Sequence, residues 1–196
     1  ADSMAAGIAF VHQELNLFDN LDVAANVFIG REPRKFGFLN IVDEDRMRAD
    51  VAPLLKRLGA NFSPDTPVSK LSLAQQQLVE IAKALSFNSK VLIMDEPTSA
   101  LNETEVEHLF AVIEDLKANG VGIVYITHKM DEVKRIADRV TIMRDGQYID
   151  TLSAPETPIS KIISLMVGRE LADATRAEGT HGQEITLRVT GLNRGK

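Results

Sequence analysis

Short apolar runs alternate along the chain with stretches in which apolar residues recur at helical spacing. Three apolar runs end in polar residues and predict buried strands: 7–11, 91–94 and 121–127. Three stretches place apolar residues three and four positions apart and predict helices: 43–58, 74–85 and 103–118. Strands that read as unbroken apolar runs and alternate with helices are typical of a parallel sheet covered on both faces. The pattern therefore predicts an α/β fold.

Residues 19–85 carry no strand signal and predict a separate helical lobe inserted between two strands of the sheet. Within it, residues 22–29 fit a short helix, with Asp19 or Asn20 available as its cap. Residues 30–40, which include Pro33 and two glycines, read as a loop.

The last third of the chain predicts smaller elements. The sequence favours a helix, then the two arms of an antiparallel hairpin, then a terminal helix: 129–137, 139–143, 148–152 and 160–167. Residues 172–183 are polar and lack periodicity, which indicates a linker. Residues 184–191 then alternate apolar and polar side chains, which predicts a strand that opens a further domain.

Composition narrows the class of protein. The chain has 196 residues, 44% of them apolar and 26% charged, which is the balance of a globular protein. It has no cysteine, so disulfides and thiolate chemistry are excluded. No apolar run approaches the ~18 residues of a membrane span, and we expect no signal peptide. The net charge of −6 disfavours nucleic acid as a partner. We therefore expect a cytoplasmic protein.

Polar residues that could act on phosphate follow the three predicted strands. Gln13 follows the first, the pair Asp95-Glu96 follows the second, and His128 follows the third. In α/β sheets, ligands bind beyond the carboxyl ends of the strands, so these side chains are expected to converge on one edge. Two carboxylates there suit divided labour, in which one holds Mg²⁺ and the other positions a nucleophilic water. An Asp-Glu pair at a solvated strand end is the alternative interpretation.

A second candidate is the start of the helix after Leu71. Ser72 and the small residue Ala74 leave backbone amides open at a positive helix end, which is a potential anion site. From the local sequence alone, the favoured interpretation is that Ser72 is only the N-cap of that helix.

Taken together, these segments resemble the ATP-binding-cassette (ABC) ATPases. Gln13 matches the Q-loop of the family, His128 its switch histidine, and residues 91–96 its Walker B motif. The signature, usually LSGGQ, corresponds to residues 71–75 (LSLAQ), and the D-loop corresponds to Ser99, Ala100, Leu101 and Asn102. Five motifs in order at suitable spacing are highly specific. The three glutamines of the signature, with residues 78–85, resemble the ATPases of monosaccharide importers, which carry two cassettes in one polypeptide.

The resemblance implies a P-loop NTPase-like (RecA-like) parallel sheet with an inserted helical subdomain. The implied divisions are the Q-loop part of the core, the helical subdomain, the Walker B part of the core, the linker and the start of a second cassette: 1–18, 19–87, 88–170, 171–183 and 184–196. It also implies residue roles. Glu96 is the general base or water-positioning carboxylate, and His128 contacts the γ-phosphate. Asp95, through its water, and Gln13 hold Mg²⁺.

The signature and the partners follow from the same resemblance. Ser72, Leu73, Ala74 and Gln75 close over nucleotide held by an opposing cassette, so hydrolysis of ATP requires a sandwich dimer. Residues 16–31 contact a membrane permease, a periplasmic sugar-binding protein acts through that permease, and the protein is peripheral on the cytoplasmic face of the membrane. The transported sugar is of the ribose, galactose or xylose kind.

The sequence departs from the family pattern in one respect, which changes the activity predicted for this chain. The sequence contains no G-x-x-x-x-G-K-[ST] run, the Walker A loop that cradles the phosphates. We therefore expect the isolated chain to be a fragment that neither binds ATP tightly nor hydrolyses it, and that self-associates through uncovered apolar surface. The alternatives are a soluble tandem-cassette translation factor, a DNA-repair cassette ATPase and a non-catalytic interaction module. Four prolines between residues 16 and 70 argue against the long coiled coil of the repair ATPases.

Overall fold

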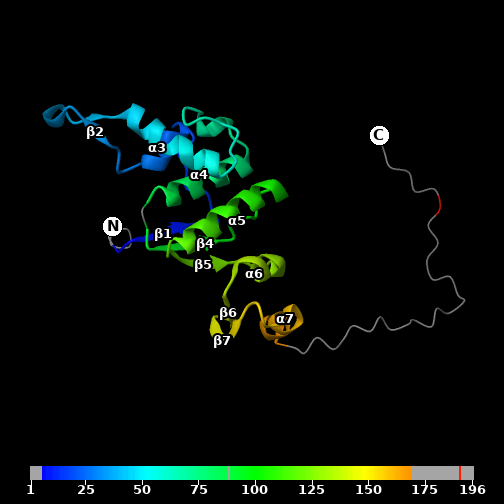
Figure 1. The fold of residues 1–196 in the computed structure, drawn as a ribbon. Helices are drawn as coiled ribbons and strands as arrows, with labels where there is room; N and C mark the ends of the chain where they lie inside the picture. Colours follow the sequence, from blue (N-terminus) through cyan, green and yellow to red (C-terminus); the bar gives the residue numbers. More distant parts are fainter. Residues whose placement is uncertain (1–5, 88, 169–189, 191–196) are drawn as a thin grey trace, which may run out of the picture. The chain divides into compact units, whose positions relative to one another are not determined.

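The computed structural model describes residues 6–87, 89–168 and 190 (Figure 1). Contacts divide the chain into two compact units, Ala1–Asp138 and Arg139–Lys196. The predicted linker and the predicted strand at 184–191 lie outside the described residues, apart from the single residue Thr190. No helix among the described residues is long and apolar enough to cross a membrane.

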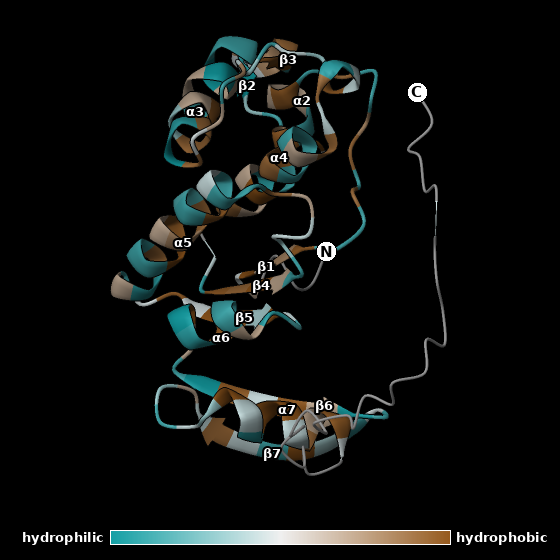
Figure 2. Cartoon of the chain, turned by 90° about the vertical axis from the view of Figure 1, so that its right-hand side faces the viewer, coloured by the Kyte–Doolittle hydropathy of each residue, from teal (hydrophilic) through white to brown (hydrophobic). Residues whose placement is uncertain are grey.

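The first unit contains a parallel sheet of three strands in the order β1-β4-β5. These strands are β1 (Ile8–Val11), β4 (Val91–Asp95) and β5 (Gly122–Ile126). Their apolar runs are short, and β1 and β4 are brown, the hydrophobic colour, over most of their length (Figure 2). β4 lies between the other two, and its partners in register are β1 and β5. The parallel arrangement predicted from the sequence is confirmed, and it brings the carboxyl ends of all three strands to one edge.

Helices cover one face of this sheet. α4 (Leu73–Leu85) contacts β1, and α5 (Glu103–Ala118) contacts β5. The residues of the strands that point to this face, such as Val11, Leu92 and Met94, are fully or almost fully buried in the core. Burial of these apolar side chains is the main force that holds the sheet to the helices.

The other face of the sheet departs from the prediction of a sheet covered on both sides. Phe10, Ile93 and Val124 are in register across the three strands, and Phe10 and Val124 are 39% and 49% exposed. Ile126, two residues further along β5, is 45% exposed. Within the described residues of the first unit, this apolar row therefore remains open to solvent.

The inserted lobe begins with α2 (Val23–Phe28) and includes α3 (Glu44–Arg57) and α4. The predicted cap of α2 is wrong by two or three residues. Asp22 caps this helix rather than Asp19 or Asn20, because its Oδ1 accepts a hydrogen bond from Ala25 N at 2.8 Å. α3 begins after the cap Asp43, close to the predicted start at residue 43.

The lobe also contains strands that the sequence did not predict. β2 (Arg34–Lys35) and β3 (Ile41–Val42) pair antiparallel within the stretch predicted to have no strands. Between them lies a 3₁₀ turn, η1 (Gly37–Leu39), flanked by Phe36 and Asn40, both with positive φ. Two residues in each strand are too few to produce a period in the sequence. A second 3₁₀ turn, η2 (Val68–Lys70), precedes α4.

The first unit ends with α6 (Met130–Ile136). The second unit consists of the hairpin β6 (Arg139–Arg144) and β7 (Gln147–Ser153) with α7 (Ile159–Val167) packed on β6. The hairpin turns at Asp145-Gly146, both with positive φ, as a two-residue loop of type I′ requires. This hairpin and the terminal helix were predicted from the sequence.

Candidate active site at the carboxyl edge of the sheet

Glu96 lies directly beyond β4 and extends the strand ladder by one residue. Its backbone N–H donates to Ile126 O at 2.9 Å, so the peptide is fixed to β5. Its φ is +44°, a left-handed conformation that is unfavourable for a residue with a Cβ. Such strain persists only where the surroundings impose it, and it concentrates at functional sites. The backbone therefore turns sharply here and directs the carboxylate away from the strand.

The carboxylate of Glu96 contacts His128, which follows β5. His128 Nδ1 lies 2.9 Å from Glu96 Oε1, with the side chains 67% and 28% exposed. This pairing joins two residues that are 32 positions apart in sequence, as the convergence of strand ends predicts. Because Nδ1 is occupied by the carboxylate, Nε2 remains available for a ligand, and no described residue bonds to it.

Asp95 and Gln13 lie at the same edge of the sheet. Asp95 is the last residue of β4 and is in register with Ile126. Gln13 is exposed and follows β1 by two residues, and the last residue of β1, Val11, is in register with Met94 of β4. Among the described residues, no hydrogen bond joins Gln13 to Glu96 or His128. The structure thus brings Glu96 and His128 into contact and places Asp95 and Gln13 on neighbouring strand ends.

The predicted D-loop continues from Glu96 as a tight turn. Ser99 N donates to Glu96 O at 3.2 Å, and Leu101 N donates to Thr98 O at 3.3 Å. Asn102 then caps α5 in a reciprocal capping box with Glu105, which fixes where the loop ends. Consequently the position of the D-loop depends on the same turn that carries Glu96.

The signature residues form the start of α4. Ser72 caps the helix, and Gln75 completes the capping box by accepting from Ser72 N at 2.9 Å. Leu73 is 64% exposed, and the backbone amides of Leu73 and Ala74 have no hydrogen-bond partner among the described residues. Ser72 is therefore an N-cap, and two amides remain open at the positive end of the helix, where an anion site stays a prediction.

Helix α4 also fixes the segment that follows Gln13. Glu80, which is 4% exposed, accepts a hydrogen bond from Asn16 N at 3.0 Å. Lys83 donates to Asn16 O at 3.4 Å, so the backbone N–H and the backbone C=O of Asn16 are both held by one helix. The helix that begins with the signature is thereby linked to the chain just beyond the Q-loop position.

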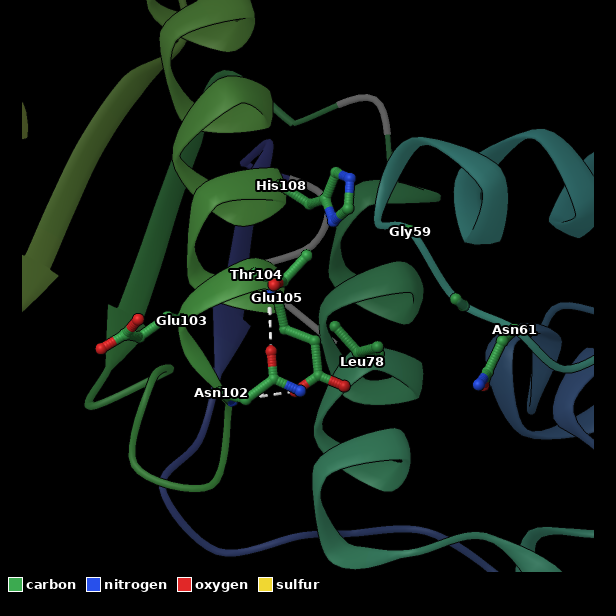
Figure 3. Close-up of a pocket in the computed structure, with 9 residues that line it drawn as sticks. Gly59, Asn61, Leu78, Asn102, Glu103, Thr104, Glu105 and His108 are labelled. Carbon is green, nitrogen blue, oxygen red and sulfur yellow. Dashed lines mark hydrogen bonds between the residues drawn. The ribbon is translucent and has the colours of Figure 1, made fainter.

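A pocket lies between α4 and the beginning of α5, with a volume of about 530 Å³ (Figure 3). The residues that line it are Gly59, Ala60, Asn61, Leu78, Asn102, Glu103, Thr104, Glu105 and His108. It adjoins Asn102 of the D-loop but includes neither Glu96 nor His128.

Sequence reasoning missed the group of side chains beneath His128. Glu132 of α6 is 6% exposed and accepts hydrogen bonds from Thr98 Oγ1 at 2.6 Å and from Tyr125 OH at 2.9 Å. It also accepts from Thr127 Oγ1 at 3.0 Å and lies 3.4 Å from Lys129 Nζ. Burial, together with Glu132, raises the pKa of Tyr125. An acid at a core-facing position of an amphipathic helix is a signal that could have identified this residue.

The parallel sheet, the inserted helical lobe and the polar strand ends define the class of protein. Solved structures of similar fold identify this class. The post-hydrolysis dimer of an ATP-binding cassette bound to ADP and Pi superimposes with a TM-score of 0.66 at 24% identity, covering 76% of this chain and 64% of that one. The cbiO1 protein of Clostridium perfringens, part of an ABC transporter complex, gives 0.60 at 32% identity, covering 84% and 64%. The fold is that of an ABC ATPase.

The family is defined by sequence. The model of the ABC transporter family matches residues 1–99, and the chain belongs to this family. A putative ribose/galactose/methyl galactoside import ATP-binding protein of Burkholderia cenocepacia is 55% identical over 99% of this chain. The match covers 38% of that relative, so the chain spans well under half the length of the curated relative.

Proposed function

We propose that the chain is part of the nucleotide-binding cassette of an importer ATPase, which couples hydrolysis of ATP to uptake of a simple sugar. The contact of 2.9 Å between Glu96 Oε1 and His128 Nδ1 is the observation that carries the proposal. It places a carboxylate and an imidazole together at the edge where α/β sheets bind ligands. The import function printed for the Burkholderia relative supports a ribose- or galactose-like substrate.

The two side chains divide the chemistry of hydrolysis. Glu96 orients the attacking water and accepts its proton at the carboxylate, while its contact with His128 Nδ1 fixes the imidazole. His128 then donates from Nε2–H to an oxygen of the terminal phosphate, a contact that requires a proton on both ring nitrogens because Nδ1–H donates to Glu96. Phosphoryl transfer needs positioning and charge stabilisation more than covalent chemistry. Glu96 and His128 supply the positioning and the charge stabilisation.

The donor groups at the edge fit Mg²⁺ as this ion is bound in nucleotide sites. Mg²⁺ takes one or two protein oxygens and obtains its other ligands from water and phosphate. Asp95 and Gln13 offer a carboxylate and an amide oxygen on adjacent strand ends. The described residues contain no group of three or more His, Cys, Asp or Glu side chains that could hold a metal alone. When bound, the ion neutralises charge on the phosphates.

The signature and the D-loop act on the opposing cassette. The open amides of Leu73 and Ala74, with the hydroxyl of Ser72, bind the phosphates of a nucleotide held across the dimer interface. The dimeric cassette with ADP and Pi among the similar structures supports this arrangement. The lobe that includes α2 contacts a membrane permease, which receives sugar from a periplasmic binding protein. The cassette is therefore peripheral on the cytoplasmic face of the membrane.

The isolated chain is expected to be inactive. Its sequence has no Walker A run, so the β- and γ-phosphates lack both the cradle of backbone amides and its lysine. The exposed apolar row of Phe10, Ile93 and Val124 is expected to promote self-association of the chain.

A chimera tests the function. The corresponding segment of the Burkholderia relative is replaced by residues 1–196, and Mg²⁺-dependent ATP hydrolysis is measured with and without Glu96→Gln. We expect the chimera to hydrolyse ATP and the variant to lose about 10²–10⁴-fold in rate. Glu103→Gln, the same chemical change on an exposed residue at the start of α5, is the control and should leave the rate unchanged. A folded chimera without hydrolysis, or equal rates for both variants, would refute the proposal.

A further inference from the structure

Glu132 joins two segments that are far apart in sequence, the turn after Glu96 and the end of β5. Its Oε1 accepts from Thr98 in the turn after Glu96, and its Oε2 accepts from Tyr125 in β5 and from Thr127 at the end of β5. Four hydroxyl or ammonium groups thus face one buried carboxylate, counting Lys129 Nζ at 3.4 Å. A buried carboxylate with every oxygen paired holds its neighbours in one geometry, because breaking the set leaves an uncompensated charge.

The contacts of Glu132 fall on both sides of His128. Thr127 precedes the histidine, and its Oγ1 accepts from Lys129 N at 3.0 Å while donating to Glu132. Lys129 follows the histidine and donates from Nζ to both oxygens of Thr98, at 3.2 Å to the carbonyl and 3.0 Å to the hydroxyl. The backbone that presents the imidazole is therefore fixed immediately before and immediately after it.

The same contacts fix the turn that carries Glu96. Thr98, 2% exposed, lies two residues after Glu96, and its carbonyl accepts from Leu101 N within the D-loop. Glu132 and Lys129 together bind the hydroxyl and the carbonyl of this one residue. The turn and the histidine loop consequently move as one body.

We propose that Glu132 is a positioning residue that sets the approach of His128 to Glu96 and fixes the D-loop relative to both. Glu132 makes no contact with the reacting groups and acts through Thr98 and Thr127. The effect of Glu132 on catalysis rests on the proposed function. Its effect on the positions of His128 and the D-loop does not, because those contacts are present without nucleotide. A change at the histidine loop would thereby be transmitted to the D-loop.

The test measures the geometry directly in the chain. In the neutral imidazole, the contact with Glu96 requires the proton of His128 to lie on Nδ1, because an ionised carboxylate only accepts. Nitrogen-15 NMR distinguishes this tautomer from the one protonated at Nε2. In Glu132→Gln we expect the ratio of the Nδ1–H to the Nε2–H tautomer to fall roughly fivefold, because the loop that holds the imidazole loosens. Amide exchange at Ser99 and Leu101 should accelerate in the same variant.

Glu107→Gln is the matched control. Glu107 pairs with Arg135 of α6 at the surface, so this variant makes the same chemical change and also removes a contact of α6. It should leave the tautomer ratio and both exchange rates unchanged. An unchanged ratio in Glu132→Gln, or an equal fall in Glu107→Gln, would overturn the inference.

Two milder variants keep the test valid if Glu132→Gln does not fold. Thr127→Val and Tyr125→Phe each remove one hydroxyl from the network and nearly preserve side-chain volume. Thr127→Val should lower the tautomer ratio, whereas Tyr125→Phe, whose hydroxyl bonds Glu132 from within the strand, should lower it less. Equal ratios in both variants and the unsubstituted chain would contradict the inference. None of these readouts involves ATP, so failure of the proposed function would appear only in the chimera.

Discussion

The left-handed backbone at Glu96 predicts that this residue lowers the stability of the fold that it serves. Glu96→Gly and Glu96→Ala both delete the contact with His128, so comparing them isolates the cost of a Cβ at a φ of +44°. A non-glycine residue in this region costs about 1–2 kcal/mol. Glycine avoids this cost, but the larger conformational entropy of its unfolded chain lowers the stability of the fold by about 0.5–1 kcal/mol. Glu96→Gly should therefore be more stable than Glu96→Ala by about 1 kcal/mol.

The neighbouring residue Asp95 supplies a control in which the glycine variant should be the less stable of the pair. Asp95 lies in β4 and is absent from the described residues with positive φ. Asp95→Gly should therefore be less stable than Asp95→Ala by about 0.5–1 kcal/mol. Urea unfolding followed by circular dichroism, at protein concentrations low enough to limit association, measures all four variants. If Glu96→Gly proves no more stable than Glu96→Ala, the backbone at this position is not strained and the reasoning fails.

Four further substitutions test the structure elsewhere. Gly59→Ala should destabilise the chain by about 2 kcal/mol or more in thermal unfolding, because φ is +67° and a Cβ would collide with His108. Gly30→Ala, where φ is +76° and the space around the Cβ is open, should destabilise the chain less. Val124→Lys should shift the chain toward monomer in light scattering by interrupting the exposed apolar row, and an unchanged mass would exclude that row as the contact. Ser72→Ala should cost about 1 kcal/mol of stability through loss of the helix cap, and no loss would show that the capping box is dispensable.

Much of the fold was predictable because its signals are local. α5 was predicted with its observed bounds, Glu103–Ala118, since apolar spacing and the closing Asn119-Gly120 both act within the element. α3 and α4 were placed within a residue or two for the same reason. The strands β4 and β5 are evident as short apolar runs, and their polar exits predict where Glu96 and His128 lie.

The sequence predictions fail where a structure depends on a residue distant in the chain or where an element is very short. The pairing of β2 with β3 depends on left-handed turns at Phe36 and Asn40, which no periodicity reveals. Glu132 was overlooked because its role depends on Thr98, 34 positions earlier in the chain. The sheet face that includes Phe10 was expected to be covered, since alternation of strands and helices predicts layers but not which face each helix occupies.

Different observations place the members of the candidate site. The Glu96–His128 pair rests on a contact, whereas Gln13 rests on its position at the exit of a neighbouring strand. Sequence order predicted that position because β1, β4 and β5 are parallel and adjacent. A hydrogen bond from an exposed amide depends on side-chain rotamers and on ligand, which the order of motifs does not determine.

The central claim is that Gln13, Glu96 and His128 share one site, and crosslinking of a chain that has no cysteine tests it most directly. Gln13 and His128 follow strands that are separated by one strand, so their backbones should lie about 10 Å apart. A bifunctional thiol reagent of that span should join Gln13→Cys to His128→Cys within one chain. It should not join Gln13→Cys to Asn119→Cys, because Asn119 precedes β5 at the opposite edge of the sheet. Failure of the first pair to react, or equal reaction of the second, would contradict the claim.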